Sequence, residues 1–268
     1  MKHMKMLYIG DIMGEAGMRV VHHVLPGLRR ERSLDLVIAQ AENVTDGKGL
    51  SLADFDRLKK MGVDFCTGGN WSLNREELNQ ALNDPAQPVI RPANYPKGTP
   101  GLGHKYIKTP AGEVLVISLL GQILGRDADK PFENPLQCVD AILAQEMQHP
   151  KVATIVNFHG DYSSEKKVIG YYLDGRVAAV VGDHWHIPTA DAMILPHGTA
   201  HITDVGMCGS LDSSLGVKLD VIVRRWQTGQ PSRNILETEG RMQFNALYVE
   251  IDEEGLATKV EHIQLIDD

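Results

Sequence analysis

Short apolar runs that end in metal-binding side chains recur along this chain, and they constrain its fold more than any other feature. Five such runs lead into Asp11, Glu42 with Asn43, Asn70, His159, and His184 with His186. Ligands in open α/β sheets bind beyond the carboxyl ends of the strands. The pattern therefore predicts an α/β fold that gathers these side chains at one edge of the structure.

The segment Gly182-Asp183-His184-Trp185-His186 follows the apolar run at residues 177–181 and is the most informative of the five. Side chains alternate along a strand, so His184 and His186 are expected to point to the same side. Imidazole is the commonest metal-binding side chain in proteins. Two surface histidines in a loop would explain this segment alone equally well, but the other strand-end polar residues favour a metal site.

Composition excludes several classes of protein. The chain has 268 residues, of which 43% are hydrophobic and 23% charged, as in an ordinary soluble globular protein. No linker-like segment interrupts it, so we expect a single domain over residues 1–268 with one core. We expect no membrane span, because every apolar run is too short, and the first residues do not have the pattern of a signal peptide.

Cysteine spacing and net charge indicate the redox setting of the protein and the kind of ligand that it binds. Cys66, Cys138 and Cys208 are too widely spaced for a zinc knuckle or a disulfide framework, which favours a reducing, cytoplasmic setting. The net charge of -8 argues against broad binding to nucleic-acid backbones, which requires a basic face. A small anionic substrate held by metal cations remains compatible with this charge.

Apolar periodicity predicts alternating strands and helices. Strands are expected over residues 6–9, 36–39, 63–67, 114–120, 152–158, 177–181, 244–251 and 260–266. Helices are expected after Gly14 and Gly17 toward Arg32, and over residues 52–61, 74–82, 135–148 and 213–225. Another helix is expected to begin at a capping Ser163. The stretch over residues 89–103, rich in proline and glycine, predicts a long loop.

Several candidate residues have a structural interpretation of their own. Asp11 would serve as a helix cap, Asn43 as a turn residue, and Asn70 as the left-handed residue of a glycine turn. Arg91 could bind a phosphate through two parallel hydrogen bonds, although a lone arginine is more often structural. These alternatives lose weight only because the residues recur together at strand ends.

The donor types indicate which metals the site would hold. Imidazole, carboxylate and carboxamide groups without thiolates suit iron, manganese or zinc. Seven candidate ligands exceed the needs of one ion and suit two ions roughly 3.5–4 Å apart. They are Asp11, Glu42, Asn43, Asn70, His159, His184 and His186. Hydrolases with such metal pairs polarise a phosphoryl oxygen and offset the charge of an anionic substrate.

The ordered motifs resemble those of a known family. Gly10-Asp11, Ala41-Glu42-Asn43, Gly69-Asn70, Phe158-His159 and His184-x-His186 are similar to the successive motifs of calcineurin-like metallophosphoesterases. The segments at 91–96, 164–166, 188–191 and 202–207 further resemble the bacterial YmdB-like subgroup. The resemblance implies two facing β-sheets flanked by helices, two iron or manganese ions, hydrolysis of small phosphodiesters such as 2′,3′-cyclic nucleotides, and a homo-oligomer.

The same resemblance implies roles for the individual ligands. The first metal would be held by Asp11 and His186, with Asn43 close to it. The second metal would be held by Asn70, His159 and His184, and Glu42 would bridge the two. Asn70 and the residue that follows it are the candidate catalytic positions.

Departures from the family pattern concern proton transfer. The family has a histidine after Gly-Asn that is taken as the proton donor to the leaving group, and this chain has Trp71 there. His201, His197 and Asp161 are the candidates to replace it, together with water on the metal.

Three further positions differ from the family pattern. Asn157 and Asp161 stand where Asp and Glu are usual, and Trp185 stands where a smaller residue is common. A non-catalytic metal- or nucleotide-binding regulator and a phosphomonoesterase are therefore the competing predictions of function.

Overall fold

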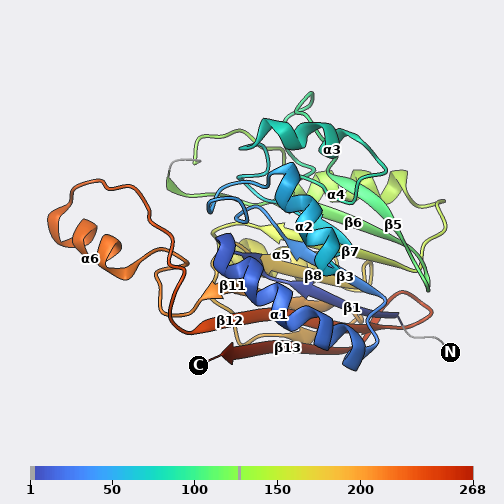
Figure 1. The fold of residues 1–268 in the computed structure, drawn as a ribbon. Coiled ribbons are helices and arrows are strands. Elements are labelled where there is room, and N and C mark those ends of the chain that lie inside the picture. Colours follow the sequence, from blue (N-terminus) through green and yellow to red (C-terminus); the bar gives the residue numbers. More distant parts are fainter. Residues whose placement is uncertain (1–3, 126–127, 268) are drawn as a thin grey trace.

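Two β-sheets that pack face to face form the centre of the structure, a computed structural model that describes residues 4–125 and 128–267 (Figure 1). The first sheet has the strand order β2-β11-β12-β1-β3-β4, and β13 also pairs with β12. Its strands are β1 (Met4–Ile9), β2 (Asp11–Ile12), β3 (Leu36–Gln40), β4 (Phe65–Thr67), β11 (Met207–Ser210), β12 (Met242–Ile251) and β13 (Ala257–Asp267).

The second sheet has the strand order β5-β6-β7-β8-β10-β9. Its strands are β5 (His104–Thr109), β6 (Gly112–Leu120), β7 (Ala153–His159), β8 (Ala179–Asp183), β9 (Met193–Ile194) and β10 (Ala200–Ile202). The expected α/β architecture of two facing sheets flanked by helices is thereby confirmed.

Helices cover the outer face of each sheet. On the first sheet these are α1 (Gly14–Arg32) and α2 (Leu52–Met61), and on the second sheet α4 (Pro135–Gln145) and α5 (Ser163–Tyr172). The 3-10 helix η1 (Glu76–Leu78) and α3 (Asn79–Asn83) follow β4. The exposed α6 (Leu219–Thr228) contributes no buried side chain.

Both faces of each sheet are apolar because each faces another layer. In β1, Leu7 and Ile9 pack toward α1, whereas Met6 and Tyr8 point into the space between the sheets. This alternation is the period of two that a strand imposes on its side chains. The apolar side chains therefore form an inner layer and two outer layers, and the expectation of one core was too simple.

Parallel strand pairs bring the candidate ligands to one edge of the sandwich. β1, β3 and β4 run parallel to one another, and β6, β7, β8 and β10 do likewise in the second sheet. The carboxyl ends of parallel strands lie at the same edge of a sheet. The residues at these ends are Asp11, Glu42, Asn70, His159 and His184.

Several local expectations differ from the structure. Apolar periodicity misses β2, β5, β9, β10 and β11, which are very short or carry polar residues such as Lys105. The expected helix over residues 74–82 begins later, as the 3-10 turn of η1. The expected cap at Ser163 is wrong, because Tyr162 occupies the cap position and makes no side-chain cap hydrogen bond.

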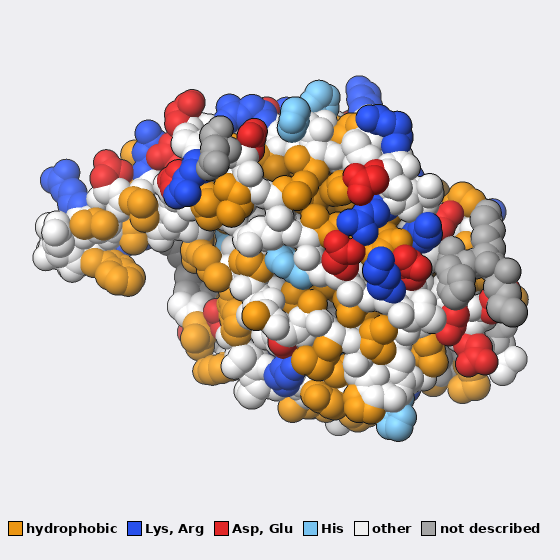
Figure 2. All heavy atoms as spheres, turned by 90° about the horizontal axis from the view of Figure 1, so that it is seen from below, with side chains coloured by type: hydrophobic (Ala, Val, Ile, Leu, Met, Phe, Trp, Pro, Cys, Tyr) orange, Lys and Arg blue, Asp and Glu red, His pale blue; other side chains and the backbone are white. Residues whose placement is uncertain are grey.

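Residues 211–241 connect β11 to β12 and form an arm that projects from the sandwich (Figure 1). The arm begins with turns rather than with the expected helix, and α6 lies near its tip. Lys218 N–H donates to the backbone oxygen of Ile235, and Glu237 N–H donates to that of Gly216, which ties the base of the arm together. Seen from below, the arm is a separate lobe with hydrophobic and basic side chains on its surface (Figure 2).

None of the helices within residues 4–125 and 128–267 has the length and apolar character needed to cross a bilayer. Cys66, Cys138 and Cys208 are free thiols, as the spacing of the cysteines indicates. Burial raises the pKa of both Cys66 and Cys208 to about 12, so neither thiol is a ready nucleophile.

Candidate metal centre

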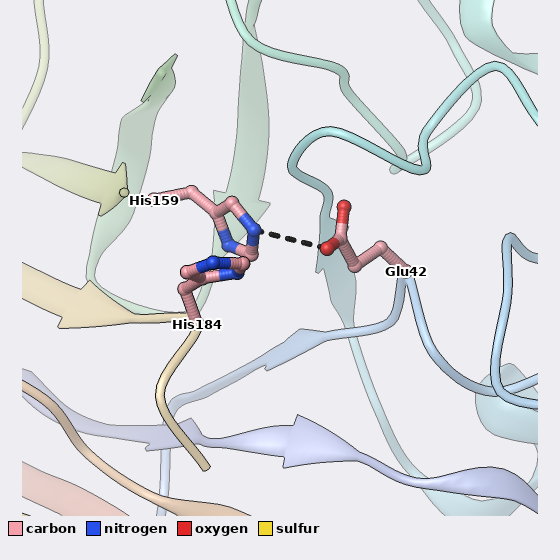
Figure 3. A group of neighbouring side chains, drawn as sticks. All are labelled: Glu42, His159 and His184. Atoms are coloured by element: carbon pink, nitrogen blue, oxygen red, sulfur yellow. Dashed lines mark ion pairs between the residues drawn. The ribbon is translucent and has the colours of Figure 1, made fainter. Parts of the chain in front are cut away.

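Glu42, His159 and His184 turn toward one another across the edge of the sandwich (Figure 3). Their potential ligand atoms all lie within 4.8 Å of one another. Glu42 follows β3 of the first sheet, His159 ends β7 and His184 follows β8, so both sheets contribute. A carboxylate and two imidazoles at this spacing can hold a divalent metal ion.

His159 is fully buried, and both of its ring nitrogens face oxygen atoms. Nδ1 lies 2.7 Å from Oδ1 of Asp183, so its proton is donated to that carboxylate. Nε2 lies 3.0 Å from Oε1 of Glu42 and 2.9 Å from Oδ1 of Asn70. A lone pair on Nε2 would face two acceptor oxygens, so either a proton on Nε2 or a cation among these atoms relieves this arrangement. The atoms around Nε2 therefore fit a shared metal ion and bring Asn70 into the cluster.

Glu42 is oriented by two backbone donors. Its Oε2 accepts hydrogen bonds from the N–H groups of Gly69, at 2.7 Å, and Trp71, at 2.8 Å, which leaves Oε1 toward His159. The turn requires glycine at position 69, because a Cβ there would lie 2.3 Å from Cδ2 of His159. The glycine turn thus brings Asn70 and the Glu42 carboxylate to the same imidazole.

A second group of nitrogen and oxygen atoms lies beside the first. Nε2 of His186 lies 3.8 Å from Oδ1 of Asp11, while its Nδ1 lies 3.2 Å from the backbone oxygen of Leu215. Oδ1 of Asp11 and Oδ1 of Asn43 are buried and have no hydrogen-bond partner among the described residues. Buried polar atoms are nearly always satisfied, so these two oxygens also fit a cation.

The two groups are joined through an unusual backbone segment. His184 N–H donates to Oδ2 of Asp11 over 3.2 Å. His184 and His186 have φ angles of 101° and 64°, in the region that side-chain-bearing residues rarely adopt. Each such residue costs about 1–3 kcal/mol and persists only where its surroundings enforce it, commonly at functional sites. The strain supports a functional role for both histidines.

The pKa values of the carboxylates differ with their partners. Burial and then the neighbouring Asp183 carboxylate raise the pKa of Asp11 well above its usual range. Burial would also raise the pKa of Glu42, but His159 and the backbone hydrogen bond from Trp71 outweigh it, so the pKa is lowered. A proton or a cation beside Asp11 would offset the repulsion between these buried carboxylates.

The pKa values of two histidines also depend on burial and neighbouring charges. Burial and then the nearby His184 lower the pKa of His186 to about 4, so this imidazole is neutral and its Nε2 can act as a ligand. Burial alone would lower the pKa of His159, but the Glu42 and Asp183 carboxylates raise it well above its usual range.

Asp183 lies at the centre of the hydrogen bonds behind the cluster, and the sequence pattern did not single it out. It accepts hydrogen bonds from Tyr8, Gln40 and Asn157 on Oδ2, while its Oδ1 holds His159. Carboxylates that orient a metal-binding imidazole fix its tautomer and raise its basicity. The available signal was the carboxylate at the strand end directly before His184. Asn157, one of the departures from the family pattern, belongs to this network as a donor.

The structure does not bring every candidate to the cluster. His201 lies on β10 beneath α5, where a Cβ on Gly170 would come within 2.8 Å of its Nδ1, and that nitrogen faces the backbone oxygen of Val180. His197 precedes β10 and therefore lies at the opposite edge of the sheet, where its N–H donates to Asp174.

Arg91 holds the long loop rather than a ligand. Its guanidinium donates to backbone oxygens of Pro92, Ala93, Thr99 and Pro100. All four acceptors belong to the loop at residues 92–100, so the structure supports the structural interpretation of this arginine. The suggested contact with a phosphate is not supported.

The cluster of Glu42, His159 and His184 opens into a cleft of about 580 Å³. Trp71, Asp161 and Trp185 line it, together with Leu215 and Ile222 of the arm. Oδ1 of Asp161 lies 3.3 Å from Nε2 of His184, and this contact, more than any other, lowers the pKa of Asp161. A mononucleotide-sized ligand would fit such a cleft, with one end at the metal cluster.

Comparisons with known proteins give a family match over nearly the whole chain. The family model described as YmdB-like protein matches residues 7–263. A 2′,3′-cyclic-nucleotide 2′-phosphodiesterase of Bacillus subtilis (strain 168) is 36% identical over 266 residues, which cover 99% of this chain and 98% of that relative.

Two solved structures are similar over nearly the whole chain. A novel phosphatase of Mycoplasma pneumoniae has 29% sequence identity and a TM-score of 0.91, covering 100% of this chain and 95% of that one. A hypothetical protein from Thermus thermophilus has 34% identity and a TM-score of 0.89, covering 99% of this chain and 100% of that one.

Proposed function

The chain belongs to the YmdB-like family and is a phosphoesterase, and from this premise we propose that it hydrolyses 2′,3′-cyclic nucleotides on a centre of two metal ions. The name of the Bacillus subtilis relative supports the substrate class. The observation that carries the proposal is the convergence of His159 Nε2 with oxygens of Glu42 and Asn70, beside the unpartnered buried oxygens of Asp11 and Asn43.

The residues around these atoms divide into two ligand sets. We assign one metal to Asp11, Asn43 and His186, the other to Asn70, His159 and His184, and a bridging role to Glu42. Iron or manganese, or less readily zinc, would supply Lewis acidity toward a phosphoryl oxygen and a nucleophile near neutral pH. Asp183 and the N–H groups of Gly69 and Trp71 would hold the ligands in place.

The proposed reaction adds water to the phosphorus of the cyclic phosphate. The bond from phosphorus to the 2′ oxygen breaks, that oxygen takes up a proton, and a nucleoside 3′-phosphate is released. Lys48 lines the cleft, with Nζ 4.8 Å from the centre of the Trp71 ring, and would attract the anionic phosphate. Lys48 and Trp71 together would orient the substrate against the metal centre.

Proton delivery to the 2′ oxygen is expected to be the slow step of the proposed reaction. Trp71 offers only an indole N–H, which does not titrate, at the position where the resemblance implies a histidine. His201 and His197 lie away from the cleft, so they do not serve as replacements. The activity should therefore favour substrates whose leaving group needs no proton.

The test is metal-dependent hydrolysis. Chelated protein, reconstituted anaerobically with Fe(II) or Mn(II), is assayed on uridine 2′,3′-cyclic phosphate, bis-p-nitrophenyl phosphate and p-nitrophenyl phosphate. We expect both diesters to be hydrolysed only by the reconstituted protein, the aryl diester faster, and the monoester poorly. Turnover that is the same with and without metal would contradict the proposal, and a preference for the monoester would favour a phosphatase.

A second candidate function is that of a binding protein that retained the metal centre and lost turnover. The presence of Trp71 in place of a proton donor favours it. Such a protein would bind the cyclic nucleotide in the presence of metal and hydrolyse neither diester. Calorimetric titration of uridine 2′,3′-cyclic phosphate into the reconstituted protein, alongside the turnover assay, separates the two functions.

A further inference from the structure

A second cleft, of about 1010 Å³, lies between the body of the protein and the arm. It adjoins the cleft of the metal cluster, because Met13, Gly47, Lys48 and Asn234 line both. The two clefts therefore form one continuous space, with the metal ligands at one end and the arm along the other. A molecule bound at the metals has room to extend into the second cleft.

Basic side chains dominate this second cleft. Lys48, Arg75, Arg225 and Arg233 line it, against a single carboxylate, Asp46, among the described lining residues. The cleft is thus lined mainly by positive charges, although the chain as a whole has a net charge of -8. A cleft lined by one sign of charge concentrates the opposite ions. The second cleft is therefore suited to an anion.

Two of the arginines are already held in position. Arg225 donates to the backbone oxygen of Ser232 over 2.9 Å and to Oδ1 of Asn234 over 2.7 Å. Arg75 donates to the backbone oxygen of Thr45 and pairs with Asp46 at 2.9 Å. A guanidinium held in this way loses less rotamer freedom when it binds a phosphate. The arm thus supplies a preorganised cation at a fixed place beside the metal cleft.

We propose that the second cleft binds a second phosphate of the substrate, attached to the 5′ oxygen of the nucleoside whose cyclic phosphate lies at the metals. This inference rests on the proposed function. The metal cleft alone has the volume for a mononucleotide, and only a longer or more highly charged molecule would use the basic extension. The substrate class is a short oligonucleotide that ends in a 2′,3′-cyclic phosphate, or a 5′-phosphorylated cyclic nucleotide.

The kinetic test compares three substrates with the manganese-loaded protein. They are uridine 2′,3′-cyclic phosphate, the same compound with a 5′-phosphate, and the dinucleotide UpU 2′,3′-cyclic phosphate. We expect kcat/KM to be about 10- to 100-fold higher for substrates with the second phosphate, the range for charge-assisted hydrogen bonds. The double variant Arg225→Gln/Arg233→Gln should lose this preference and retain its rate on the mononucleotide.

Arg224→Gln is the matched control, because Arg224 lies on the same helix and lines neither cleft. The proposal is overturned if the three substrates have equal kcat/KM in the wild-type protein, or if the preference survives in the double variant. A preference shown by the 5′-phosphorylated nucleotide and the dinucleotide alike identifies the phosphate as the group that is recognised. A preference shown by the dinucleotide alone would mean that the added nucleoside is recognised rather than the phosphate, and would overturn the proposal.

Calorimetry separates this proposal from the proposed function. If the wild-type protein hydrolyses none of the three substrates, the proposed function fails. The affinities for uridine 3′-phosphate and uridine 3′,5′-bisphosphate then show whether the second cleft binds a phosphate. Tighter binding of the bisphosphate that disappears in Arg225→Gln/Arg233→Gln supports the phosphate site, whereas equal affinities overturn it.

Discussion

At the scale of single residues, Trp71 is expected to decide which leaving groups the site can expel. Its backbone N–H holds Glu42, while its ring lies at the wall of the cleft under Lys48. We expect Trp71→His to restore a proton donor and to raise kcat/KM for uridine 2′,3′-cyclic phosphate. Positioned proton transfer contributes roughly 10²–10⁴-fold, so a gain of at least about tenfold is expected. The rate on bis-p-nitrophenyl phosphate should change little.

Trp71→Phe is the control for this prediction, because it keeps an aromatic ring without a titrating group. His201→Gln is a second control and should leave both rates unchanged, since His201 lies beneath α5. Metal content must be equal in all variants. Equal gains for histidine and phenylalanine at position 71 would mean that ring size, rather than proton donation, limits the wild-type protein.

Asp183 is the residue expected to set metal affinity without touching the metal. Its Oδ1 holds Nδ1 of His159 at 2.7 Å. We expect Asp183→Asn to weaken the affinity for Mn(II) by about 10- to 100-fold, the usual effect of losing such a partner. Titration of Mn(II) into the chelated protein measures this affinity. Asp174→Asn, at the opposite edge of the second sheet, should have no effect, and an unchanged affinity in Asp183→Asn would contradict the assigned role.

At the scale of elements, a buried ion pair positions the segment that carries the histidines. Nζ of Lys166 on α5 lies 2.8 Å from Oδ2 of Asp204 and 2.6 Å from the backbone oxygen of Asp183, and all three residues are buried. The same Oδ2 accepts the N–H of Trp185 over 2.8 Å. These contacts with helix α5 and with the segment after β10 therefore fix the strained turn at residues 184–186.

We expect Lys166→Met to lower the free energy of unfolding by about 3–5 kcal/mol, because it leaves the Asp204 charge buried without its partner. The neighbouring Lys167→Met is the control, since its pair with Asp191 is partly exposed and should contribute at most about 1 kcal/mol. Urea unfolding of the chelated proteins measures both values. Equal losses of unfolding free energy in the two variants would contradict this role of the buried ion pair.

The sequence predicts the site better than it predicts its surroundings. Asp11, Glu42, Asn70, His159 and His184 follow apolar strands, and the rule that parallel strands end at one edge is enough to bring them together. Asp183 could not be identified in this way, because its partner His159 is set by the register between β7 and β8, in which the two residues lie opposite each other. Sequence spacing carries no information about that register.

The arm is a second part of the structure that the sequence pattern predicts only in part. Periodicity over residues 213–225 predicts a helix, yet periodicity cannot tell whether an apolar face packs on the body or remains exposed. In the structure α6 buries none of its residues, and Trp226 is 84% exposed. The expected homo-oligomer stays a prediction, as does the assignment of residues 1–268 to a single domain.

At the scale of the whole molecule, the metals should couple the two sheets. The proposed ligands lie on β2 or follow β3 and β4 in the first sheet, and lie on or follow β7 and β8 in the second, so binding would favour the folded sandwich over the unfolded chain. A ligand at 100 times its Kd stabilises the folded state by about 2.7 kcal/mol. We therefore expect Mn(II) to raise the melting temperature of the chelated protein, measured by calorimetry, whereas Mg(II), which prefers oxygen ligands, should raise it less. Equal shifts with the two ions would contradict a site built on imidazoles.

The metal-to-protein ratio of the anaerobically reconstituted protein, measured by elemental analysis after removal of unbound ions, tests the two-metal centre most directly. We expect a ratio close to two, which falls to about one in His186→Ala, because that change removes a ligand from one set alone. A wild-type ratio of one or less, or a ratio that His186→Ala leaves unchanged, would contradict the two-metal centre.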